Sequence, residues 1–164
     1  MNALTNAEVG RYLNANFVST YQKVGTFTIN GAKKQGGNVA SYFCTANGRV
    51  LHTIAGPVNA DVLLREARWV VETSKMADLQ GARTEARLRL VWRKAHAERL
   101  HNEHDVDLKQ VTRTRRRPHL NKQGKVHYLL AMNCLPRLEQ VYKYVFEDIL
   151  HERVSTAPVE RRGG

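Results

Sequence analysis

The pattern of apolar residues in the first third of the chain predicts a β-hairpin. Two β-prone runs, residues 39–45 and 49–55, flank Asn47-Gly48, and both residues of this pair tolerate the positive φ angles of a type I′ turn. Apolar residues occupy successive positions in these runs, as in Tyr42-Phe43-Cys44, instead of alternating with polar ones. Such strands are typical of a sheet that helices cover on both faces, so we expect an α/β fold.

Helical periodicity surrounds this hairpin. Apolar residues three and four positions apart predict helices over residues 3–16, 59–76 and 78–103, with a bend at Gly81 between the last two. Residues 17–24 alternate in the manner of a strand, and residues 26–29 predict a short strand or an edge segment. The stretch 30–38 is rich in glycine but lacks the GxxxxGK[ST] order of a phosphate-binding loop, so we expect a solvated connection.

The last third of the chain carries its longest apolar segments. The first part of the run 125–135 is expected to add a strand, and Pro136 is expected to open a helix. This helix has a wide apolar stripe that includes Val141, Val145 and Ile149, which must be buried against this domain or in a dimer. An unknown protein partner, or a homodimer through the 136–150 helix, is therefore one expectation.

Charge and composition narrow the class of protein. The chain of 164 residues has a net charge of +11, and residues 1–82 hold 8 Lys and Arg against 5 Asp and Glu, whereas the remainder holds 18 against 10. No segment approaches 18 consecutive apolar residues, and the N-terminus lacks the pattern of a signal peptide. Two cysteines far apart in the sequence favour a reducing compartment. We expect a cytoplasmic protein that does not span a membrane.

The order of these elements resembles a known family. Residues 6–24, NAEVGRYLNANFVSTYQKV, and 39–67, VASYFCTANGRVLHTIAGPVNADVLLREA, resemble variants of the thioredoxin-like superfamily over about residues 4–76. The resemblance implies a thioredoxin-like mixed sheet with a partial N-terminus in a first domain, residues 1–76. A helical, basic extension over 77–154, with a connector at 112–119, and a disordered tail over 155–164 would follow.

Two departures from the family decide what the resemblance implies about activity. The chain has no CxxC motif, and Gly36-Gly37-Asn38-Val39 stands where the family has a cis-proline. The sequence begins at about the first long helix, so the family's first strand and redox loop are also expected to be missing. No catalytic residue carries over, and Cys44, inside a strand, is expected to pack as a small hydrophobic residue. The favoured function is a non-catalytic scaffold or binding module without a cofactor.

Two alternatives stay open. Arg113, Arg115, Arg116 and Arg117 form a basic run that could bind the phosphates of nucleic acid non-specifically, although no aromatic residue interrupts it for base stacking. The other alternative is a divergent thiol-redox or metal-dependent enzyme.

The metal-dependent alternative depends on residues 101–107, HNEHDVD, in which His101, His104 and Asp105 are weak candidate ligands. His52 and His127 lie alone in apolar runs and are interpreted as structural.

Overall fold

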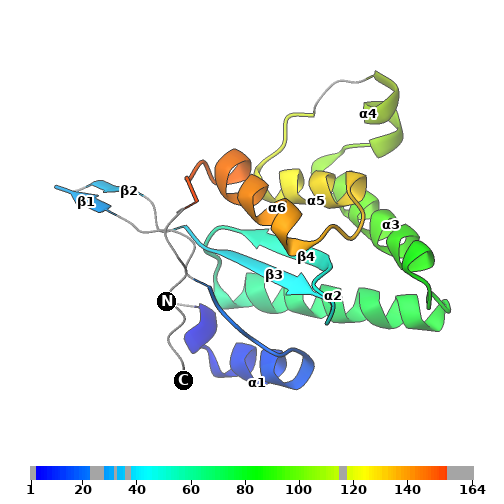
Figure 1. Ribbon diagram of the computed structural model, residues 1–164, viewed down its shortest axis with the longest axis horizontal. Helices are drawn as coiled ribbons and strands as arrows, with labels where there is room; N and C mark the ends of the chain where they lie inside the picture. Colours follow the sequence, from blue (N-terminus) through cyan, green and yellow to red (C-terminus); the bar gives the residue numbers. More distant parts are fainter. Residues whose placement is uncertain (1–2, 23–27, 32, 36–37, 115–117, 155–164) are drawn as a thin grey trace.

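A computed structural model shows that the expected hairpin lies between two layers of helices (Figure 1). The structure describes residues 3–22, 28–31, 33–35, 38–114 and 118–154. The hairpin consists of β3 (Ala40–Cys44) and β4 (Val50–Ala55), which pair in antiparallel fashion. A second, smaller hairpin of β1 (Thr28–Asn30) and β2 (Lys33–Gln35) projects from one end of the molecule. The fold is therefore mixed α/β, as the sequence predicts.

The helices account for most of the described chain. They are α1 (Ala7–Asn16), α2 (Ala60–Leu79), α3 (Glu85–His104), α4 (Leu108–Thr114), α5 (Lys122–Met132) and α6 (Leu138–Tyr144). A short 3₁₀ turn, η1 (Ala3–Thr5), precedes α1, and a π-helical turn, η2 (Val145–Ile149), continues α6. None of the described helices is long and apolar enough to cross a membrane.

Helices cover both faces of the hairpin. Phe43 and Ile54 on one face share an apolar core with α1 and α2. Val50 belongs to a second core with α5, α6 and η2, against which Tyr42 and Cys44 of β3 also pack. Strand β4 is accordingly buried along almost its whole length. The successive apolar residues of this segment are explained by that double coverage.

The turn of the hairpin differs from the expected type I′. Only Gly48 has a positive φ, 77°, and the pairing register shifts between Phe43 and Cys44. The Gly48 N–H donates to the Thr45 carbonyl, and Arg49 N–H donates to the Thr45 hydroxyl. This pattern is that of a three-residue loop with glycine at a bulge. The Asn-Gly signal predicted the hairpin correctly and its turn type wrongly, because the Thr45 side chain stabilises the longer loop.

Helix α2 begins and ends close to the predicted positions, whereas α3 begins at Glu85, later than the predicted start at residue 78, and ends at His104, close to the predicted end. Asn59 caps α2 by accepting a hydrogen bond from Val62 N–H at 2.9 Å, and Thr84 caps α3. Between them Gly81 adopts a left-handed φ of 64°, which is the predicted bend. The helix expected over 3–16 is shorter, because Asn6 caps α1 and leaves η1 before it.

Two predicted strands are absent from the described residues. Residues 17–22 are extended without strand pairing, and 23–24 lie outside the described residues. The run 125–135 is mostly helix α5, because Asn121 caps Gly124 N–H at 2.8 Å and buried positions such as Val126, Leu130 and Ala131 recur with helical spacing. The expected loop at 30–38 contains strand β2.

The stripe of the last helix is buried within the chain. Val141, Val145 and Ile149 pack on β4 and α5 in the second apolar core. The burial that this stripe requires is thus met without a partner. The expected tail, 155–164, lies outside the described residues.

Candidate functional site

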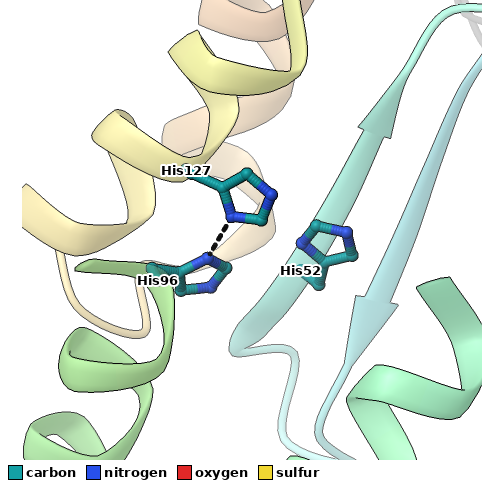
Figure 2. A group of neighbouring side chains, drawn as sticks. All are labelled: His52, His96 and His127. Atoms are coloured by element: carbon teal, nitrogen blue, oxygen red, sulfur yellow. Dashed lines mark hydrogen bonds between the residues drawn. The ribbon is translucent and has the colours of Figure 1, made fainter. Parts of the chain in front are cut away.

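Three buried histidines meet between the hairpin and the C-terminal helices (Figure 2). His52 lies on β4, His96 on α3 and His127 on α5, and none is more than 1% exposed. One nitrogen from each ring lies within 4.8 Å of the other two. We call these residues the histidine cluster. Among the described residues it is the one group of three or more side chains close enough to share a metal ion.

Tertiary packing brings the three histidines together. The ring of His52 stacks on those of His96 and His127, with centroids 5.7 and 5.2 Å apart. The ring of Trp69, from α2, meets all three at centroid distances of 5.0 to 5.9 Å. An aromatic wall therefore fixes the orientation of the imidazoles and keeps water from them.

The hydrogen bonds around the cluster define the proton positions on its rings. His96 Nε2 lies 2.9 Å from the Leu51 carbonyl, which can only accept, so this nitrogen carries the hydrogen. His52 Nε2 lies 3.0 Å from a carboxylate oxygen of Glu66 and donates in the same way. The neutral ring of His96 then offers the lone pair of Nδ1, and His127 Nδ1 donates to it at 2.9 Å.

This arrangement leaves two lone pairs without hydrogen bonds. His52 Nδ1 and His127 Nε2 are buried and have no partner among the described residues. Nearby His104 Nε2 is also buried without a partner among the described residues, and the ring of His104 lies 6.4 Å from that of His127. A buried acceptor without a partner costs about 1–3 kcal/mol, and native proteins keep few of them. Two such acceptors in neighbouring rings make this cluster the candidate site for a metal ion.

Burial keeps the cluster uncharged. It lowers the pKa of all three histidines, that of His96 to about 3, and charge on His52 would lower those of His96 and His127 further. Burial alone would raise the pKa of Glu66, but hydrogen bonds from His52 and Arg99 outweigh it and hold this pKa well below its usual range. At neutral pH the site thus contains three neutral imidazoles beside one carboxylate.

A charged network closes the cluster toward solvent. The two terminal nitrogens of the Arg99 guanidinium, Nη1 and Nη2, donate to the Glu66 carboxylate, Nη2 at 3.0 Å, and Nε donates to Glu103 at 2.5 Å. The guanidinium also lies 4.8 Å from the centre of the Trp69 ring. Arg99 and Trp69 line a surface groove of about 590 Å³ between α2 and α3. These two side chains separate the groove from the histidines.

The structure does not gather the ligands predicted for the segment after α3. His101 and Asp105 are exposed, and Asp105 ends α3 in a left-handed conformation with φ 53°. His104 instead points inward against Gly124 of α5. The predicted ligands thus lie more than one helical turn after His96, the member of the histidine cluster on the same helix.

The arginine run is only partly described. Arg113 is exposed on α4, and Arg115, Arg116 and Arg117 lie outside the described residues. Binding of nucleic acid through this run stays a prediction.

Cys44 has the environment expected of a packing residue. It is half-buried, and burial and then the charge of Glu139 raise the pKa of its thiol. Reactive cysteines need the opposite shift. The protonated thiol favours packing over redox chemistry.

Comparisons with known proteins add no relationship. No family model, curated protein or solved structure matches the chain. The thioredoxin-like resemblance and the domain boundary at residue 76 therefore stay predictions, and function is argued from the site alone.

Proposed function

We propose that this chain is a metal-binding protein that holds a zinc-like divalent ion at His52, His96 and His127. The observation that supports this proposal is the convergence of three buried, neutral imidazoles, of which His52 keeps its Nδ1 lone pair without a partner among the described residues. Metal ligation requires neutral imidazole, and a metal ion is the partner that a buried lone pair lacks here.

The surroundings of the cluster match those of known histidine ligands. Such ligands commonly donate their second ring nitrogen to a carboxylate or a backbone carbonyl, which fixes the ring and its tautomer. Glu66 occupies this position for His52, and the Leu51 carbonyl occupies it for His96. These two hydrogen bonds place the ring hydrogen of His52 and of His96 on Nε2, so that Nδ1 carries the lone pair in both rings. For His127 a change of tautomer would release the hydrogen now shared with His96.

Imidazole ligands suit zinc, copper, nickel and iron, and zinc accepts three histidines most readily in a tetrahedral site. Two nitrogens bound to one zinc lie roughly 3.3 Å apart, since each Zn–N bond is about 2.0 Å. The nitrogens of the cluster are within 4.8 Å of one another. Small inward rotations of the rings would therefore suffice to bind an ion.

Complete burial favours a structural role for the ion. The ligands come from β4, α3 and α5, so an ion would join the hairpin to both of these helices. Substrate would not reach such an ion while Trp69 and Arg99 stay in place. The ion would stabilise the fold, as structural zinc does elsewhere.

Metal analysis of protein prepared without a histidine tag tests the proposal. We expect about one zinc per chain, or one Co²⁺ after exchange, with the visible absorption of a tetrahedral site. Added ion should raise the melting temperature of chelator-treated protein, because an ion at 100 times its Kd stabilises by about 2.7 kcal/mol.

The matched variants are His127→Gln in the cluster and His101→Gln on the surface. The first should lose the ion and the second should keep it, with circular dichroism confirming that each is folded. If chelator-treated wild type gains neither thermal stability nor a Co²⁺ spectrum, the proposal is wrong whatever the variants do.

A further inference from the structure

A second groove, away from the histidine cluster, lies where the start of α3 meets the segment between α5 and α6. Its volume is about 600 Å³, and Arg49, Arg89, Asn133, Gln140 and Tyr144 are among its lining residues. No acidic side chain lines it among the described residues. We call it the two-arginine groove.

The charge of this groove is not balanced. Arg49 and Arg89 both bond the same oxygen of Glu85, at 2.9 and 2.5 Å. Two guanidinium groups thus share one carboxylate, which is about half exposed and therefore well screened. The amide oxygen of Gln140 accepts from Arg137 N–H at 2.9 Å, so its NH₂ group stays available as a donor. The groove offers donors and net positive charge, the requirements of a phosphate ester.

The position of Arg49 is fixed before any ligand binds. Its side chain is only 19% exposed, and its Nη1 donates to the Leu135 carbonyl at 3.4 Å. Leu135 adopts a φ of 50°, a conformation that costs a leucine about 1–3 kcal/mol. Backbone hydrogen bonds from Val50 N–H to the Pro136 carbonyl and from Leu138 N–H to the Gly48 carbonyl join this segment to the hairpin.

Positive charge continues beyond the groove along α3. Arg93 is exposed one turn after Arg89 on this helix, which is 20 residues long, and Arg87 and Lys94 are exposed on another side of it. Neither Arg87 nor Arg93 forms an ion pair with another described residue, whereas Lys94 lies 3.7 Å from Glu98. A helix of this length extends about 30 Å, which exceeds the size of a single small anion.

An aromatic ring lies at the edge of the groove. Tyr144 lines it and is 41% exposed. Proteins that bind single strands combine a basic groove with exposed aromatic side chains on which bases stack. The two-arginine groove thus has both basic side chains and an exposed aromatic ring, whereas the arginine run 113–117 has no aromatic residue.

We propose that the two-arginine groove and the exposed face of α3 bind single-stranded nucleic acid. Arg49 and Arg89 hold one phosphate, a neighbouring base stacks on Tyr144, and the strand continues past Arg93 along α3. This surface shares no residue with the histidine cluster, so it is expected to act whether or not an ion is bound.

Fluorescence anisotropy of a labelled 15-nucleotide oligopyrimidine, as DNA and as RNA, tests this proposal with the full chain at 50 and 200 mM salt. The informative variants are Arg89→Ala and Tyr144→Ala, both at exposed positions. Their controls are Arg11→Ala, an exposed arginine on α1, and Tyr21→Ala, which is 91% exposed in the segment after α1.

We expect Arg89→Ala and Tyr144→Ala each to weaken binding about 5-fold or more, and the salt slope of Arg89→Ala to fall by about 1. The controls should change Kd less than about 2-fold. Equal losses in Arg89→Ala and Arg11→Ala would show that net charge alone causes binding and would overturn the proposal. It also fails if a duplex of the same length, or a mononucleotide, binds as tightly as the single strand.

Discussion

His96 Nδ1 and His127 Nδ1 lie 2.9 Å apart, each in a ring with at most 1% of its surface exposed. Two nitrogens at this distance share a single hydrogen, and the Leu51 carbonyl already requires one on the far side of His96. The pair is therefore locked in one protonation state unless an ion replaces the shared hydrogen. Several consequences of this arrangement can be measured.

Stability should depend steeply on acidity. The three histidines have lowered pKa values in the folded chain, so below pH 6.5 the unfolded chain binds more protons and folding becomes less favourable as pH falls. Three histidines that protonate only on unfolding give a slope of up to about 4 kcal/mol per pH unit near pH 5. Glu66 adds to the loss at lower pH, because its folded pKa is lowered as well.

Urea unfolding at pH 7, 6 and 5 with a chelator present, followed by tryptophan fluorescence, measures this slope. His101→Gln should keep it, since that side chain is exposed. A free energy of unfolding that stays constant between pH 7 and 5 would contradict three buried neutral histidines.

Neutralising Glu66 should lower the free energy of unfolding far more than neutralising Glu103, although both carboxylates bond Arg99. Glu66 is 2% exposed and Glu103 is 42% exposed, yet both bond Arg99. Glu66→Gln leaves the largely buried Arg99 guanidinium with only the half-exposed Glu103 as a charge partner, and removing one member of a buried pair costs about 3–5 kcal/mol. Glu103→Gln should cost under about 1 kcal/mol. Chemical unfolding of the two variants checks the order, and equal losses would show that the Glu66 pair is exposed in solution.

Two helical glycines should respond differently to alanine. A Cβ at Gly10 meets nothing within 4 Å, so Gly10→Ala should stabilise the protein by about 1 kcal/mol through helix propensity. A Cβ at Gly124 would lie 3.0 Å from a Leu120 methyl and 3.1 Å from His104 Nδ1. Gly124→Ala should therefore gain none of that stability. Thermal unfolding of the pair measures the difference, and equal gains would show that His104 moves aside freely.

Cys44 should react slowly with thiol reagents. Burial and the charge of Glu139 raise the pKa of its thiol, so little thiolate forms at pH 8. In a Cys134→Ser background, labelling by a disulfide reagent is expected to be slower than that of a free cysteine by about 10-fold or more. Labelling as fast as free cysteine would reopen the thiol-redox alternative.

Local signals in the sequence predicted the hairpin and the long helices. Asn59 and Thr84 are caps that can be recognised by residue type, and Gly81 marks the bend, because each acts on its immediate neighbours. The helix at 122–132 was not predicted, because its dense apolar run resembles a buried strand until tertiary packing exposes the helical spacing.

The histidine cluster could not be found by motif spacing. Thirty-one positions separate His96 from His127, and His52 is on another element altogether. The sequence feature that could have pointed to the cluster is a histidine inside an apolar run, which occurs at His52 and at His127. His101, His104 and Asp105 lie close together in the sequence, but in the structure His101 and Asp105 are exposed, whereas His104 lies against Gly124 of α5.

The separation of the three histidines along the chain also has a consequence for biosynthesis. Strand β4 is made early, but the faces of α5 and α6 that bury Val50 come more than 70 residues later. A nascent chain that ends before α5 therefore leaves Val50 without the helices that cover it. Such a chain is a substrate for chaperones and proteases, and folding is complete only once the last third has left the ribosome.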